Sequence, residues 1–195
     1  MQNMSCKIYM DHAATTEMLP QVRKAMEPYL MEEYGNASTS YEMGRRTREA
    51  LEGAREQIAM LIKAKPEEIF FTSGGSESDN WVIKNVVAEK KEKGKHVITS
   101  KIEHHAVLRS CEYLEKLGYE LTYLDVDAYG VIDLAQLREV LREDTTLVSV
   151  MTGNNEIGTI EPLDAVASML RGTGTLFHTC LLYTSPSPRD TERSR

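Results

Sequence analysis

The sequence predicts an α/β protein with a mostly parallel sheet flanked by helices. From residue 68 onward, short apolar runs alternate with longer stretches whose apolar residues recur at helical spacing. This alternation is typical of βαβ units. In addition, polar motifs at residues 74–76, 103–105 and 154–156 each follow the end of a predicted strand. Ligands of such sheets bind outside the carboxyl ends of the strands, so we expect these motifs to converge on one edge.

The first third of the chain is predicted to be mainly helical. An apolar stretch at residues 7–10 leads into a loop at 11–16. Apolar residues on one face predict a helix over 20–34, which a turn at 35–38 interrupts. A longer helix is expected from about Tyr41, and Pro66 closes that helical region.

The remainder is predicted to alternate regularly. Expected strands span residues 68–72, 96–100, 119–124, 147–151 and 175–178, and expected helices span 77–91, 105–117, 134–141 and 162–170. Gly118 is a plausible C-cap between a helix and a strand. Right-handed crossovers between parallel strands imply that helices cover both faces of the sheet.

Composition narrows the function classes. The chain has 195 residues and a net charge of −7, which suits one globular domain, or a domain plus part of another, and gives no sign of a nucleic-acid surface. No apolar run approaches the roughly 20 residues that span a bilayer, and the N-terminus is too short and polar for a signal peptide. Cys6, Cys111 and Cys180 have neither disulfide-framework nor metal-ligand spacing. We therefore expect a cytoplasmic protein without a metal site.

The stretch around residues 70–81 combines a β-type run, two glycines and the start of a helix. Gly74 and Gly75 allow a ligand to approach the backbone closely, and the first helical turn offers free N–H groups. Ser76 adds a hydroxyl. The stretch is therefore a candidate phosphate site. The alternative is an ordinary serine-capped helix after a glycine turn.

Five motifs in order give this sequence a family resemblance. They are DHAATT at 11–16, GN at 35–36, FTSGGSESDN at 71–80, EHHAV at 103–107 and NNEIG at 154–158. This set resembles the cysteine desulfurases, which are pyridoxal-phosphate enzymes of the class V aminotransferase group. The resemblance runs from about Tyr9 to about His178. It implies the large domain of a PLP-dependent transferase of fold type I, with pyridoxal 5′-phosphate as cofactor.

The resemblance also implies site residues. Gly75 and Ser76 would hold the cofactor phosphate. His104 would stack on the pyridine ring and serve in proton transfer, whereas a surface or helix-capping histidine is the alternative. Asn155 would contact the ring hydroxyl or the substrate carboxylate, unless it only forms a turn. Asp79, like Glu77, is most simply an acid near a helix N-terminus that the dipole favours.

The activity implied by the resemblance is removal of sulfur from L-cysteine. The products would be L-alanine and an enzyme persulfide that supplies iron–sulfur cluster assembly or thiolation pathways. Expected partners are a sulfur-acceptor or scaffold protein and a second copy of the chain in a homodimer. Another class V enzyme, such as a selenocysteine lyase, and a non-catalytic dimerisation remnant remain as alternatives.

The resemblance stops after residue 179. The family continues with an aspartate that pairs with the pyridinium nitrogen, where this chain has Cys180. The last lysine is Lys116, so no later residue matches the family's Schiff-base lysine. The loop with the sulfur-accepting cysteine is also missing. The sequence therefore predicts an N-terminal segment and a partial large cofactor-binding domain over residues 1–179, truncated in mid-domain. It also predicts a non-native or disordered tail over 180–195 and an inactive chain. A natural shortened protein is the alternative.

Overall fold

The computed structural model describes residues 8–10, 12 and 15–181 of the chain. The chain divides into two compact units, Met1–Phe71 and Thr72–Arg195. Half of the loop expected at 11–16, including Asp11, lies outside the described residues, as does Cys6.

The described part of the first unit is helical. It contains α1 (Pro20–Met31), α2 (Glu42–Ile62) and a short 3-10 helix, η1 (Pro66–Glu68). The helix α1 begins with a proline, whose fixed φ suits a first helical position, and ends three residues before the predicted boundary. The helix α2 ends at Ile62, and its C-cap residue Lys63 adopts the left-handed conformation with φ of 57°. Pro66 is the first residue of η1, so the chain turns between α2 and η1.

The glycine–asparagine turn before α2 is packed tightly against the first turn of that helix. A Cβ atom on Gly44 would lie 2.6 Å from the carbonyl oxygen of Asn36, and one on Gly35 would lie 2.6 Å from the carbonyl of Met43. The turn is held by Asn36, whose side-chain oxygen accepts a hydrogen bond of 2.9 Å from the N–H of Ser38. Backbone approaches this close require glycine at both positions.

The strand predicted at residues 68–72 does not form, and that prediction was wrong. Glu68 belongs to η1, and Ile69 is extended with φ of −99° and ψ of 124°, but no strand among the described residues pairs with this segment. A strand requires a backbone partner. The carbonyl oxygen of Ile69 instead accepts from the guanidinium of Arg55, which also lies 5.1 Å from the ring centroid of Phe71. The apolar run at 69–71 therefore contains residues that favour strands and begins in an extended conformation, but it does not belong to a sheet.

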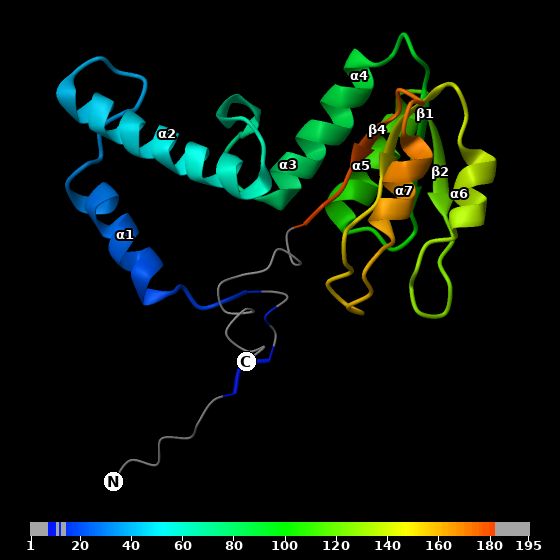
Figure 1. Cartoon of the computed structure of the whole chain (residues 1–195), viewed down its shortest axis with the longest axis horizontal. Coiled ribbons are helices and arrows are strands. Elements are labelled where there is room, and N and C mark those ends of the chain that lie inside the picture. Colours follow the sequence, from blue (N-terminus) through cyan, green and yellow to red (C-terminus); the bar gives the residue numbers. More distant parts are fainter. Residues whose placement is uncertain (1–7, 11, 13–14, 182–195) are drawn as a thin grey trace. The chain divides into compact units, whose positions relative to one another are not determined.

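The second unit is the α/β domain that the alternation predicts. Its strands are β1 (His96–Ser100), β2 (Glu120–Leu124), β3 (Thr145–Ser149) and β4 (Leu176–His178). Its helices are α3 (Gly75–Trp81), the π-helical turn η2 (Val82–Val86), α4 (Val87–Glu89), α5 (His105–Lys116), α6 (Leu134–Val140) and α7 (Leu163–Leu170). The four strands are all parallel, in the order β2-β1-β3-β4. Figure 1 labels β1, β2 and β4 among the helices of this unit. The α/β expectation is therefore confirmed.

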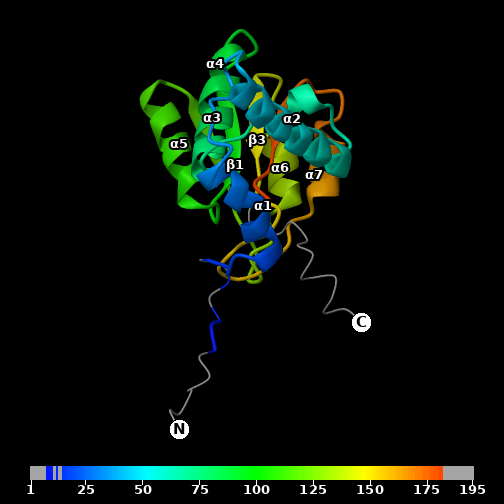
Figure 2. The same cartoon turned by 90° about the vertical axis from the view of Figure 1, so that its left-hand side faces the viewer.

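Two buried layers of side chains lie on opposite faces of the sheet. Val97 and Leu147 point into one core with residues of α5 and the α3–α4 segment. Their chain neighbours Ile98 and Val148 point into the other, which α6 and α7 cover. Figure 2 shows α3 and α5 on one side of the strands and α6 and α7 on the other. Because both faces are covered, β1 and β3 are buried along their whole length.

β3 begins two residues before its predicted start, because polar residues take part in the sheet. Thr145 and Thr146 are fully buried. The hydroxyl of Thr145 lies 2.8 Å from Nδ1 of His96, and that of Thr146 donates to the His96 carbonyl at 3.0 Å. The other ring nitrogen of His96 lies 2.9 Å from the hydroxyl of Thr122 in β2. This buried histidine therefore links three strands, and burial lowers its pKa.

A lysine connects the amino ends of β3 and β4. The Nζ atom of Lys93 donates to the carbonyl oxygens of Thr145, at 2.7 Å, and Thr173, at 3.1 Å. It also donates to the hydroxyl of Thr175 at 3.0 Å. The predicted helix over 77–91 is the continuous segment α3–η2–α4, which starts two residues earlier than expected and ends before this lysine. No helix in the described part of the chain is long and apolar enough to cross a membrane.

Candidate cofactor site

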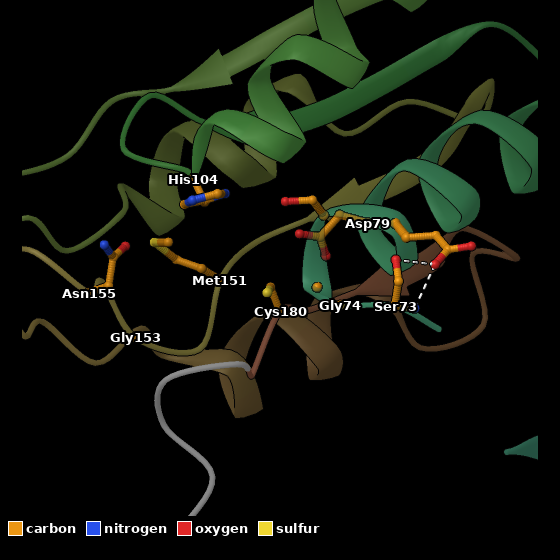
Figure 3. Close-up of a pocket in the computed structure, with 11 residues that line it drawn as sticks. Ser73, Gly74, Asp79, His104, Met151, Gly153, Asn155 and Cys180 are labelled. Carbon is orange, nitrogen blue, oxygen red and sulfur yellow. Dashed lines mark hydrogen bonds between the residues drawn. The ribbon is translucent and has the colours of Figure 1, made fainter. Parts of the chain in front are cut away.

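The strand order reverses between β1 and β3, because β2 is added on one side of β1 and β3 on the other. A pocket of about 360 Å³ opens at the carboxyl ends of these strands, where ligands of such sheets bind (Figure 3). Its lining residues are Ser73, Gly74, Gly75, Ser76, Glu77, Asp79, His104, Met151, Gly153, Asn155 and Cys180. All four residues that the sequence marks for the cofactor, Gly75, Ser76, His104 and Asn155, thus line one pocket.

One wall of the pocket is the N-terminus of α3. The helix begins at Gly75, so the first N–H groups of the helix have no acceptor within it. Gly74 precedes it in an extended conformation, with φ of 163°. A Cβ atom built on Gly74 meets no other atom within 4 Å, so space remains beside the free N–H groups. These groups, with the Ser76 hydroxyl, suit an anionic oxygen cluster such as a phosphate.

Glu77 stabilises the turn that leads into this helix. Its carboxylate accepts hydrogen bonds of 2.6 Å from both the N–H and the hydroxyl of Ser73, as the dashed lines in Figure 3 show. The bond from the Ser73 hydroxyl lowers the pKa of Glu77. The carboxylate is therefore occupied by the turn itself, which leaves the N–H groups of the next residues for a ligand.

Asp79 has a different environment from the one that the sequence suggests. It is only 4% exposed, and its Oδ1 atom lies 3.5 Å from Nε2 of His178 at the end of β4. The Nδ1 atom of that histidine lies 2.8 Å from the hydroxyl of Ser149 in β3. Asp79 lines the pocket and also joins α3 to β4, so its interpretation as a simple helix-dipole acid is incomplete. The contact involves residues far apart in the chain, which no local pattern reveals.

His104 both caps a helix and lines the pocket. Its Nδ1 atom accepts a hydrogen bond of 3.1 Å from the N–H of Ala106 at the start of α5. This bond places any proton of the neutral ring on Nε2. The helix-capping alternative is thus observed, and it is compatible with a role in the pocket because it fixes the ring. His105, treated as structural, is exposed and lies outside the pocket lining.

Both asparagines at 154 and 155 take part in the turn that follows β3. Asn154 forms the turn: its Oδ1 accepts from the N–H groups of Glu156 and Ile157, at 2.8 and 3.0 Å. Its Nδ2 donates to the carbonyl oxygen of Ile102 at 2.9 Å. Asn155 itself lies in this turn, as the sequence allowed, and it also lines the pocket opposite the N-terminus of α3 (Figure 3).

Sequence reasoning gave no role to three other lining residues. Met151 and Gly153 follow β3, and Gly153 forms an isolated antiparallel bridge with Ile160. Cys180 lies between Met151 and Gly74 in Figure 3. Cys111, by contrast, is fully buried in the core, and burial raises the pKa of its thiol to about 12, so it is inert in the folded state.

None of the pocket residues is a lysine, and Lys116, the last lysine of the sequence, belongs to α5. Among the residues that the structure describes, no group of three or more His, Cys, Asp or Glu side chains is arranged to hold a metal ion. The donor set of the pocket is instead helix N–H groups, a hydroxyl, an imidazole and an amide, which fits an organic phosphate with a flat polar ring.

The chain is similar to known proteins over most of its length. Residues 8–180 match the family described as aminotransferase class-V. The chain is 51% identical over 181 residues to "Cysteine desulfurase IscS" of Dictyoglomus turgidum, covering 93% of this chain and 46% of that relative. A solved "NifS-like protein" superposes with a TM-score of 0.86 at 38% identity, covering 88% of this chain and 48% of the other. "SspA in complex with cysteine" gives 0.83 at 37% identity, covering 88% and 49%. The chain thus spans about half the length of these proteins.

Proposed function

This chain belongs to the aminotransferase class-V family, and on that premise we propose that its pocket binds pyridoxal 5′-phosphate as the N-terminal part of a cysteine desulfurase. One observation carries the proposal. Gly75, Ser76, His104 and Asn155 come from three separate segments and line a single pocket at the reversal point of the strand order. A helix-capping serine or a turn-forming asparagine alone would not require that convergence.

The pocket residues divide into a phosphate end and a ring end. Backbone N–H groups at Gly75 and Ser76, with the Ser76 hydroxyl, would hold the phosphate in the open space beside Gly74. The half-buried ring of His104, fixed through Nδ1, would cover the pyridine ring. The Asn155 amide would contact a polar substituent of the ring or the substrate. When bound, the cofactor supplies an electron sink for cleavage of bonds to the substrate's reacting carbons.

The proposed substrate is L-cysteine. In the overall reaction the carbon–sulfur bond of L-cysteine breaks, and the sulfur atom passes to an enzyme thiol, giving L-alanine and an enzyme persulfide. The name of the Dictyoglomus turgidum relative and the cysteine in the SspA complex support this choice. His104 would exchange a proton with the substrate through Nε2, since Nδ1 is bonded to the backbone.

Cofactor binding is tested first, with the 195-residue chain. Equilibrium dialysis measures the affinity for pyridoxal 5′-phosphate in the original chain, in Ser76→Ala and in a control, Ser168→Ala, which removes an exposed hydroxyl from α7. We expect saturable binding that Ser76→Ala weakens about tenfold, for one lost charge-assisted hydrogen bond. Equal affinity in all three proteins would refute the assignment of the phosphate site.

Activity is tested with a chimera. Residues 1–179 are joined to the corresponding C-terminal part of the Dictyoglomus turgidum relative, and alanine and sulfide are measured with cysteine as substrate. We expect catalytic turnover in the chimera and none in the 195-residue chain, whose pocket lacks a lysine. The His104→Ala chimera should lose turnover while still folding. A chimera that folds, binds the cofactor and acts only on selenocysteine would establish the alternative lyase.

The proposal extends to partners and location. Within the first unit, α1 has no buried residue, and apolar side chains such as Leu30 and Met31 are 69% and 73% exposed. A homodimer that covers this face is expected, with a sulfur-acceptor or scaffold protein as a further partner of the complete enzyme. The buried thiol of Cys111, which is in no disulfide, suits a reducing cytoplasm. Sedimentation of the purified chain tests the dimer.

A further inference from the structure

Glu103 is the residue before His104, yet it points away from solvent. It is 5% exposed and lies between the end of β1 and the start of α5. Its Oε1 atom accepts a hydrogen bond of 2.6 Å from the N–H of Met151, just beyond β3, and a weaker one of 3.4 Å from the Ser100 hydroxyl at the end of β1. One carboxyl group thus bridges the two strands on either side of the pocket.

A second bond crosses between the same two loops. Asn154 donates from Nδ2 to the carbonyl of Ile102, on the other side of Glu103 from His104. The chain from 102 to 104 is therefore tied twice to the segment from 151 to 154. Since Met151 and Asn155 line the pocket, these ties set the spacing between the His104 ring and the residues that face it.

We infer that Glu103 is a positioning residue that acts in its neutral, protonated form, holding His104 in register with the loop after β3 so that the pocket keeps the shape that pyridoxal 5′-phosphate needs. This inference rests on the proposed function of the pocket. It adds a role for a buried carboxyl group that does not itself line the cofactor pocket.

The surroundings of Glu103 favour the neutral form. Its second oxygen, Oε2, is buried and has no hydrogen-bond partner, a costly position for a full negative charge. Burial raises the pKa of Glu103 to about 8, and the nearby acids Asp79, from α3, and Glu161 add to this rise. The Cys111 thiol of α5 is a further titratable neighbour, and the Glu103 charge raises its pKa. The bond from the Met151 N–H opposes the rise without cancelling it.

The experiment measures cofactor affinity against pH by equilibrium dialysis of the 195-residue chain. If only the neutral form positions His104, affinity in the original chain should fall about tenfold between pH 7 and pH 9 relative to Glu103→Gln. Glutamine keeps the acceptor oxygen and cannot ionise, so Glu103→Gln should hold the affinity at pH 7 without that extra fall. Glu103→Ala should bind weakly at every pH. The control Glu139→Gln removes the same charge from an exposed position on α6, and its affinity should vary with pH as in the original chain.

Titration of the cofactor itself is common to all four proteins and cancels in the comparison. Parallel profiles for the original chain and Glu103→Gln would overturn the inference, as would full affinity in Glu103→Ala. The ring resonances of His104, identified with a His104→Gln variant, provide a second measurement without cofactor. We expect an inflection near pH 8 in the original chain that is absent in Glu103→Gln.

The two measurements separate two kinds of failure. If no protein binds the cofactor while the His104 inflection depends on Glu103, the proposed function of the pocket fails and the positioning role stands. If the inflection is also the same in both proteins, the positioning role is refuted.

Discussion

Gly74 offers a way to change the proposed phosphate site without disturbing the fold. Its backbone is extended, with φ of 163°, a conformation that alanine adopts without strain. A Cβ atom at this position meets no protein atom within 4 Å. Gly74→Ala should therefore fold normally, because the smaller entropy of the unfolded chain, worth about 0.4–1 kcal/mol, offsets the poorer preference of alanine for the N-cap position.

The same methyl group should oppose cofactor binding, because Gly74 lines the pocket beside the free N–H groups of α3. An added methyl group in a fitted space typically costs about 1–3 kcal/mol. That range corresponds to a loss of affinity of roughly five- to 150-fold. The variant should thus be about equal in stability and clearly lower in affinity, a combination that general destabilisation does not produce.

Urea unfolding and equilibrium dialysis with pyridoxal 5′-phosphate measure the two quantities on the same preparation. Gly53→Ala, at a helix position that also has no atom within 4 Å of the added Cβ, is the control and should leave affinity unchanged. The reasoning fails if Gly74→Ala binds the cofactor as well as the original chain. It also fails if Gly74→Ala unfolds at a markedly lower urea concentration, since the added Cβ would then not lie in open space.

Three further predictions concern the two units. In α2, Gly44→Ala should weaken hydrogen-exchange protection, because its added Cβ would lie 2.6 Å from a backbone oxygen. Gly53→Ala should strengthen protection in the same helix by up to about 1 kcal/mol, because its added Cβ meets no atom within 4 Å. A change of the same sign in both variants would contradict this prediction. Burial lowers the pKa of His96 in the folded protein, so as the pH falls the unfolded state binds the proton first. The free energy of unfolding, measured with urea, should therefore decrease as the pH drops below about 6.5. His96→Asn should remove part of that slope, and an unchanged slope would count against it. Lys93→Met should cost about 1.5–3 kcal/mol in the same assay because it leaves carbonyl oxygens without their charged donor, whereas the exposed Lys91→Met should have little effect.

Local patterns were enough to predict elements that are rich in β-branched residues or have an amphipathic pattern. The strand at 96–100 and the helix from 105 appear where they were expected. The strand at 68–72 was wrong because pairing depends on a neighbouring strand, which residue preferences do not reveal. β3 starts early because Thr145 and Thr146 are buried through bonds to His96, some 50 residues away.

The site was predictable to the extent that topology determines it. The carboxyl ends of parallel strands meet at one edge, so placing the motifs after strands was enough to bring His104 and Asn155 to one pocket. The environments of Asp79 and Glu103 were not predictable in this way. Their burial depends on contacts with His178 and Met151, which only the folded chain brings near.

The strand order also bears on how the sheet assembles during translation. The central strand β1 is the first of the four to be synthesised, and β2 then adds to one side of it. β3 adds to the other side, and β4 adds to β3. Each strand after β1 therefore emerges from the ribosome when a strand it pairs with already exists. Growth outward from the first strand allows this unit to form its sheet stepwise, in the direction in which the ribosome delivers it.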